Sequence, residues 1–156
     1  MADHRISRRE AEAADEFGRL QMLHEGAASC LDGHLDELTP GLRALTVLFA
    51  FVGDVDNGGF AACMYNSTGD LTGEAITAAK QIRAEAHADV FERFASLALD
   101  GDLTMDRETR EARLEEMGDQ ATAALEALDE EFYALPSIDR LLAAYVDEHP
   151  REFFTD

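Results

Sequence analysis

The stretch TPGLRALTVLFAFVGDVDNGGF, residues 39–60, decides how this chain folds. Thr39 and Pro40 are typical of a helix start, because a threonine side chain caps free backbone N–H groups and proline is pre-organised for the first helical position. Residues 42–52 are apolar on nearly every side, which predicts a helix at the centre of the fold. The Asn-Gly-Gly sequence at residues 57–59 then interrupts this pattern.

The interruption favours a hinge between two helices over a catalytic loop. Glycine adopts the left-handed backbone conformation that ends a helix, and it lets the next helix turn back closely. We therefore expect Phe60, Met64 and Tyr65 to enter the core. Asn66 and Gly69 are expected to end the short second helix in the same way.

Helical spacing continues along the rest of the chain, where strict apolar/polar alternation is absent and β-branched residues are sparse. The other predicted helices cover residues 7–23, 27–35, 60–65, 72–82, 86–99 and 138–148, and residues 107–135 form one long helix or two stacked pieces broken near Gly118. The fold class predicted is all-α. Residues 1–156 are expected to form a single domain, a compact bundle of about six to eight helices.

The same spacing predicts the core. The buried residues are expected to include Leu45, Leu48, Phe49, Val52, Phe60, Phe91, Phe94, Leu128 and Phe132. Phe17 and Leu20 are expected on the buried face of the first helix, and the Phe153-Phe154 pair is expected to have an exposed edge.

The charge of the chain is its strongest compositional signal. The sequence holds 33 acidic and 13 basic residues, a net charge of −20, and residues 100–156 alone hold 17 acids and 5 bases. Such a chain repels phosphates, so direct binding to nucleic acid or to an anionic membrane is not expected. No apolar run approaches the roughly 20 residues that span a bilayer, and the first residues are charged where a signal peptide is apolar, so we expect a cytoplasmic location.

A helical projection of residues 107–135 separates an apolar face from an acidic one. The acidic stripe consists of Glu108, Glu111, Glu115, Asp119, Glu126, Asp129 and Glu130. On one continuous helix it would run for about 30 Å, close to the 34 Å of one turn of duplex DNA. A solvated helix face is the simpler interpretation of such a stripe.

Sequence patterns for metals, cofactors and catalysis are weak. Residues 100–111 place oxygen ligands as in a calcium loop, but Met105 stands where that loop needs glycine. His24, Cys30 and His34 have partial zinc-ligand spacing without a fourth ligand, and the two cysteines are expected to be buried thiols. Nucleophile, P-loop and dinucleotide motifs are absent from the sequence, so we predict no catalytic residue, no cofactor and no metal.

Three blocks of sequence carry a family resemblance. They are Asp54-Val55-x-Asn57-Gly58-Gly59-Phe60 with Tyr65-Asn66-Ser67-x-Gly69, then Ile82-Arg83-Ala84, then the segment from Leu128 to Tyr133. Over about residues 40–155 the chain resembles the bacterial DNA-mimic protein family. It departs from the family at Asp54, where glutamate is usual, at Ala62, where glutamine is usual, and at Arg83, where glycine is common.

The resemblance implies an all-helical, acidic, often dimeric protein, whose namesake occupies the DNA-binding surface of a transcription factor. The chain is thus expected to be a non-enzymatic interaction module that presents the acidic stripe to a basic partner protein. Two alternatives remain open. The acidity reflects the composition of the host, or the region from Asn57 to Asn66 forms an enzyme or small-ligand site.

Overall fold

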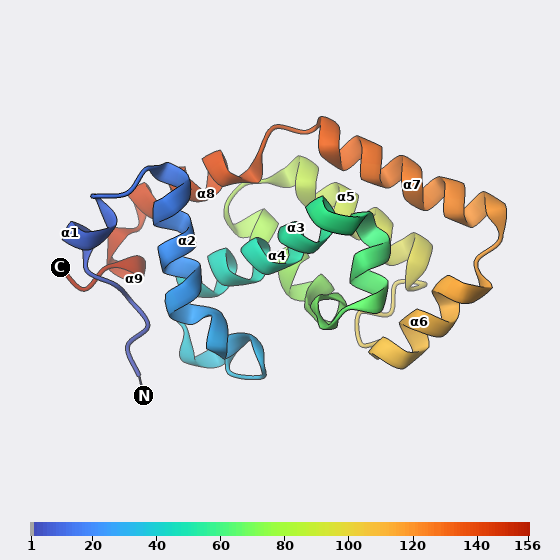
Figure 1. Cartoon of the computed structure of the whole chain (residues 1–156), viewed down its shortest axis with the longest axis horizontal. Coiled ribbons are helices and arrows are strands. Elements are labelled where there is room, and N and C mark those ends of the chain that lie inside the picture. The colour runs from blue at the N-terminus through green and yellow to red at the C-terminus, as the bar shows by residue number, and fades with distance from the viewer. Residues whose placement is uncertain (1) are drawn as a thin grey trace.

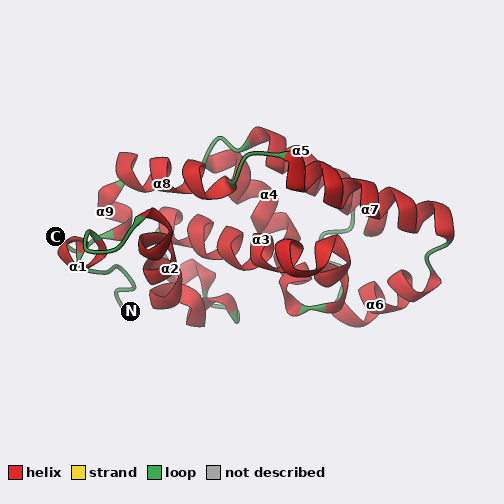
Figure 2. Ribbon diagram, turned by 45° about the horizontal axis from the view of Figure 1, so that its top comes forward, coloured by secondary structure: helices red, strands yellow, loops and turns green. Residues whose placement is uncertain are grey.

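The computed structural model describes residues 2–156, which are helical almost throughout (Figures 1 and 2). The α-helices are α1 Arg8–Ala11, α2 Glu16–Ala27, α3 Pro40–Tyr65, α4 Thr72–Gln81, α5 Glu85–Ala98, α6 Arg107–Glu116, α7 Asp119–Ala134, α8 Ile138–Glu148 and α9 Pro150–Phe153. Short 3₁₀ helices cover Ala28–Leu31, Leu35–Glu37 and Ser67–Leu71. Within this part of the chain there is no strand, and the predicted all-α fold is confirmed.

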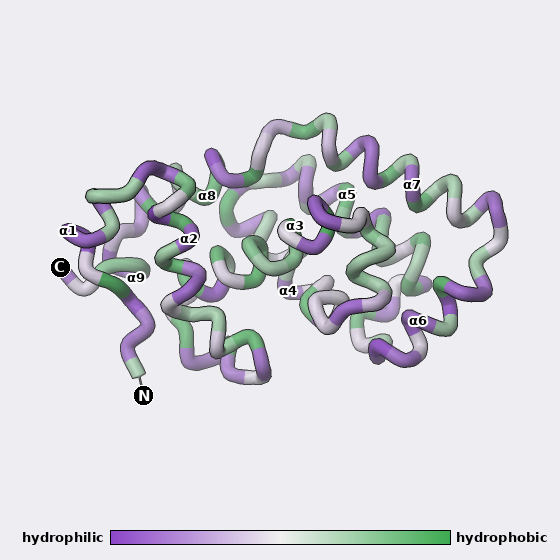
Figure 3. The backbone as a smooth tube through the Cα atoms, in the orientation of Figure 1, coloured by the Kyte–Doolittle hydropathy of each residue, from purple (hydrophilic) through white to green (hydrophobic). Residues whose placement is uncertain are grey.

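Helix α3 is the centre of the fold, as its apolar sequence predicts. Thr39 caps it by accepting a hydrogen bond from the N–H of Leu42, and Pro40 is its first residue. Helices α2, α4, α6, α7 and α8 all pack against α3, which is largely apolar along its length (Figure 3). The helix continues through Asp54 and Asp56 to Tyr65, well beyond the expected apolar run.

By length and composition alone, α3 is the one helix among residues 2–156 that is long and apolar enough to cross a membrane. Half of its most apolar window is buried inside the protein. Core helices of globular proteins pass the same test, so this property by itself says little about location.

The predicted hinge is a kink within α3. Gly59 has φ 67° and ψ −173°, a conformation that is essentially restricted to glycine, whereas Gly58 at φ −150° needs no glycine. After the kink, Phe60 and Met64 are fully buried, as expected. Tyr65 is 45% exposed, so the prediction that it enters the core is wrong.

Aromatic side chains from α3, α5 and α7 meet in the core. The Phe60 ring stacks on Phe94 at 4.9 Å between centroids, and Phe91 meets Phe51 edge to face at 5.0 Å. Most of the predicted core residues are buried, namely Leu45, Leu48, Phe60, Phe91, Phe94, Leu128 and Phe132. Phe49 and Val52 are partly buried against this core.

The N-terminal region differs most from the sequence prediction. Residues 7–23 do not form one helix, because Asp15 caps a new helix by accepting a hydrogen bond from the N–H of Gly18 at 2.7 Å. Phe17 is 53% exposed and lies beside Phe49, so its predicted burial is wrong. Of the predicted helix over residues 27–35, Ala27 ends α2 and Ala28–Leu31 form a 3₁₀ helix rather than an α-helix.

The two ends of the described chain lie at the same end of the molecule (Figure 1). The N–H of Ile6 donates to the carbonyl of Phe153, and the N–H of Thr155 donates to the carbonyl of Ile6. Phe153 and Phe154 are buried, so the expected exposed edge of this pair is absent. These contacts join residues far apart in the sequence, and Phe153 and Phe154 are buried where the two ends meet.

Candidate functional site

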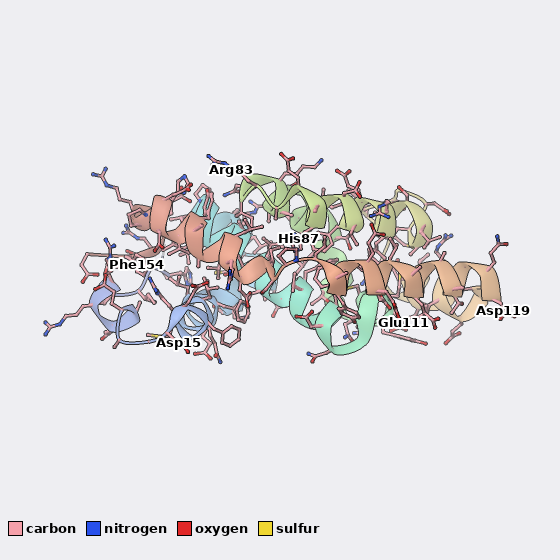
Figure 4. All side chains as sticks on the ribbon, turned by 90° about the horizontal axis from the view of Figure 1, so that it is seen from above. Asp15, Arg83, His87, Glu111, Asp119 and Phe154 are labelled. Atoms are coloured by element: carbon pink, nitrogen blue, oxygen red, sulfur yellow. The ribbon has the colours of Figure 1, made fainter. Side chains whose placement is uncertain are left out.

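Helices α6 and α7 form the end of the molecule that lies opposite the termini (Figure 1). Figure 4 shows Asp119 at one extreme and Phe154 near the other. Between the two helices, Met117 and Gly118 are extended, with ψ 126° and 170°. The break therefore falls where one of the two sequence interpretations placed it, near Gly118.

The single 30 Å acidic stripe does not exist, because it required a continuous helix. Leu114 and Met117 pack against the core, and Gly118, a poor helix former, lets the chain turn after them. The acidic residues consequently lie on two helices that diverge from the turn (Figure 1).

The three arginines of α6 are all engaged by neighbouring parts of the fold. Arg110 is fully buried, and its guanidinium donates to Asp70 at 2.7 Å, to the carbonyl of Met105 at 2.8 Å and to that of Asn66 at 3.0 Å. Arg113 donates to the carbonyl of Ala98. The guanidinium groups of Arg110 and Arg113 therefore point into the fold rather than lying beside the exposed carboxylates of α6.

The remaining α6 contacts involve two further ion pairs. Arg113 pairs with Asp100 at 2.9 Å, and Arg107 pairs with Glu111 at 3.2 Å. Arg107 also donates to the carbonyl of Tyr65. Glu111, a member of the predicted stripe, is therefore partly neutralised.

Most carboxylates of α6 and α7 have no such partner. Six of them are exposed and form no ion pair with any residue in the range 2–156. We name them the acidic end: Glu108, Glu115, Glu116, Asp119, Glu126 and Glu130. Five of these belong to the predicted stripe, and Glu116 was missed because it lies off the arc of a continuous helix.

Asp129 has a different role from the rest of the predicted stripe. Its Oδ1 accepts a hydrogen bond of 2.7 Å from the N–H of Phe60, the first residue after the α3 kink. Burial raises the pKa of the Asp129 carboxyl, and the hydrogen bond from Phe60 opposes part of that shift. Asp129 thus positions α7 on α3, as does the Tyr133 hydroxyl, which donates to the carbonyl of Val55 at 2.7 Å.

The polar block around the kink, which includes Asp54, Asn66 and Gly69, is used for helix packing. Asp54 accepts hydrogen bonds from the Asn66 amide and from the Thr68 hydroxyl. Gly69 lies against Arg110, where a side chain would come within 2.4 Å of the guanidinium. Asn57 is apart from these contacts and lines a cavity of 220 Å³ beside Phe17. Asn57 and Asn66 therefore do not contribute to one common site.

Neither of the weak metal patterns from the sequence forms a site. In residues 100–111, Asp100 pairs with Arg113, Asp102 accepts from Thr104, and Asp106 caps α6. These carboxylates do not gather around a common point in the part of the chain that the structure describes. His24 stacks on Phe49 at 4.7 Å between ring centroids. Cys30 and Cys63 are buried free thiols, as expected.

The left-handed turn at Arg83 matches the family pattern noted above. Arg83 has φ 64°, a conformation in which glycine is favoured, and it follows the end of α4. A family model described as DMP19-like protein matches residues 36–149. The chain belongs to the DMP19-like family. We found no match to it among curated proteins or among solved structures.

Family membership covers the kinked α3, the acidic end and α8. The matched range includes α6 and α7, whereas α1, α2 and the 3₁₀ turn Ala28–Leu31 lie outside it. The resemblance to the DNA-mimic family is therefore confirmed.

Proposed function

We propose that this chain is an acidic interaction module that presents the acidic end to a basic protein surface in place of DNA phosphates. One observation carries the proposal: the arginines of α6 are engaged by the fold, while six carboxylates on α6 and α7 stay exposed and unpaired. A surface whose acidity arose only from composition would have no reason to separate the two signs of charge in this way.

The physical basis is electrostatic. Helical carboxylates three or four residues apart, such as Glu126 and Glu130, are about 5–6 Å apart at Cβ and repel each other slightly. A concentrated negative field attracts a basic partner over long range and raises the association rate. A DNA-binding protein such as a transcription factor is the expected partner, because its basic surface is built to face phosphates.

Two other functions are less well supported. A small-ligand or catalytic site at the kink would need free polar groups, but Asp54, Asn66 and Arg110 bond one another or the backbone. Host composition explains the net charge of −20 without explaining its placement. The family resemblance also implies a dimer. A dimer interface on another face of the molecule would leave the acidic end free to bind a partner.

The test is the triple variant Glu115→Gln, Glu126→Gln and Glu130→Gln. All three are exposed and unpaired, so the fold should keep its stability or gain slightly as like-charge repulsion falls. The native partner is captured from a lysate at low salt, and its affinity for each variant is measured by biolayer interferometry. We expect binding to weaken by about tenfold, since three exposed charge pairs contribute roughly 0.2–1 kcal/mol each.

The matched control is Glu10→Gln, Glu25→Gln and Glu148→Gln, which removes the same charge from exposed positions on α1, α2 and α8. It should bind like the wild type, and duplex DNA should compete with the protein for the partner. Equal losses in both triple variants would mean that only net charge matters, and the mimicry proposal would then fail.

A further inference from the structure

A histidine, a cysteine and a glutamate meet where the N-terminal segment passes the two 3₁₀ turns before α3. The Nε2 of His4 lies 3.3 Å from the Sγ of Cys30. The carboxylate of Glu37 completes the group, and the ligand atoms of all three residues lie within 4.8 Å of one another. Local spacing in the sequence does not bring these residues together, because His4 is 26 residues from Cys30.

The imidazole of His4 is oriented as in metal sites. Its Nδ1–H donates to the carbonyl of Gly26, near the end of α2, at 3.1 Å. In the neutral ring this contact leaves the lone pair on Nε2, which faces the sulfur of Cys30. A backbone carbonyl that binds the second ring nitrogen is the usual way in which a metal-binding histidine is held.

The other two residues are also positioned by the fold. Cys30 is 2% exposed and lies in the 3₁₀ turn Ala28–Leu31. Glu37 ends the next 3₁₀ turn, and its Oε1 accepts a hydrogen bond of 3.1 Å from Nδ1–H of His34. His34 thus holds the carboxylate beside the thiol and the imidazole.

We propose that His4, Cys30 and Glu37 bind a zinc ion, with water as the fourth ligand. Sulfur, imidazole nitrogen and carboxylate oxygen are all zinc ligands, and the thiol excludes calcium and magnesium as the preferred ion. Tetrahedral zinc at usual bond lengths holds sulfur and nitrogen about 3.5 Å apart, close to the observed 3.3 Å. The Glu37 carboxylate needs to move closer by roughly 1 Å, which a partly exposed side chain permits.

Binding replaces the thiol proton by the metal. The S–H bond of Cys30 breaks, the thiolate forms a bond to zinc, and the proton leaves to water. The ion would tie the N-terminal segment to the chain between α2 and α3. Two of its three ligands, His4 and Cys30, lie outside the family-matched residues, and the site is independent of the acidic end.

The first experiment uses the full chain, freed of metal with a chelator. Zinc is titrated against a chromophoric competitor, and cobalt(II) is added in a parallel sample as a spectroscopic probe. We expect one zinc per chain, and for cobalt a sulfur-to-metal charge-transfer band with the strong visible bands of a tetrahedral site. A cobalt spectrum without the sulfur band would overturn the proposal, and this readout needs no variant.

Variants then assign the ligands. Cys30→Ser, His4→Gln and Glu37→Gln should each weaken zinc binding, the first two by more than about 100-fold, since loss of an outer-shell partner alone costs 10–100-fold. The controls are Cys63→Ser, which alters the other buried thiol, and His24→Gln, which alters a histidine of α2. Both should bind zinc like the wild type. Zinc affinity that is unchanged in His4→Gln and Cys30→Ser would also overturn the proposal.

Discussion

Two independent features require glycine at position 59: its backbone conformation and the close approach of Asp129. Its φ of 67° with ψ −173° is strained for any residue with a Cβ. A Cβ there would also lie 2.3 Å from Oδ2 of Asp129. Because Asp129 accepts the hydrogen bond from Phe60, a side chain at position 59 would displace the contact that positions α7 on α3.

Gly59→Ala should therefore destabilise the protein by about 1–3 kcal/mol from backbone strain, with a further loss from the displaced Asp129 contact. Urea unfolding followed by circular dichroism measures the change. Gly53→Ala is the matched control, because that glycine lies in the same helix and has nothing within 4 Å of the added methyl group. It should be neutral or stabilising by up to about 1 kcal/mol.

At Arg83 the same backbone argument predicts that a change to glycine stabilises the protein. This arginine is exposed and has φ 64°, so Arg83→Gly should stabilise the protein by roughly 1 kcal/mol through relief of left-handed strain. If Gly59→Ala and Arg83→Gly both left the unfolding midpoint unchanged, backbone conformation would not control either turn.

At the scale of elements, the contact between α3 and α8 brings two acids together. Asp56 of α3 and Asp139 of α8 line one cavity of 240 Å³ with the buried His87. Partial burial raises the pKa of Asp56, and the negative charge of Asp139 raises it further. Burial likewise raises the pKa of Asp139. Ionisation of either carboxyl therefore weakens the packing of the two helices.

Asp56→Asn should raise the free energy of unfolding at pH 7, and the gain should shrink as the pH falls. The folded state binds the Asp56 proton more tightly than the unfolded state, whose pKa is near the ordinary 3.8. The cost of ionisation is therefore complete above the raised pKa and absent below the ordinary value. Urea unfolding of both proteins between pH 7 and about pH 4 measures the difference.

The control for this prediction is Glu148→Gln, which removes an exposed charge from the same helix α8. Its effect should be small at every pH tested. A gain for Asp56→Asn that grew toward acid pH would have the wrong sign for a raised pKa and would contradict the account of this helix contact.

At the scale of the whole molecule, a net charge of −20 on 156 residues works against compactness. Ion pairs offset only part of this, because the six carboxylates of the acidic end form no ion pair with any of residues 2–156. Added salt screens repulsion between exposed charges over distances beyond about 10 Å at 0.1 M. The folded state, which holds the charges closer than the unfolded chain, should benefit more from screening.

The melting temperature should accordingly rise between about 10 mM and about 500 mM sodium chloride. Each kcal/mol of relieved repulsion corresponds to roughly 2–4 °C for a chain of this size. Differential scanning calorimetry measures the shift, with sucrose at matched osmolality as the control for solute effects other than screening. The Glu115/Glu126/Glu130 variant should show a smaller shift than wild type, whereas an equal shift would mean that the acidic end carries no repulsion.

The sequence by itself determined the helices from α3 onward and most of the core. Helix starts depend on nearby residues, so Thr39-Pro40 predicted the start of α3, and the Asn-Gly-Gly sequence predicted its kink. Helical spacing likewise predicted burial of Phe60, Phe91 and Phe132, because one face of each helix must leave water. The family blocks, which are also local, predicted the match over residues 36–149.

Only the tertiary structure decided which charged groups are free and which are engaged. A helical projection put Asp129 beside Glu126 and Glu130, but the N–H of Phe60, 69 residues away, holds its carboxylate. Arg110 is charged, yet it is fully buried against Asp70 and Asn66. The tertiary structure likewise brings His4, Cys30 and Glu37 together. The physical reason is that hydrogen bonds and burial depend on residues that are close in the fold but distant in the sequence. The spacing of residues within one helix carries no information about them.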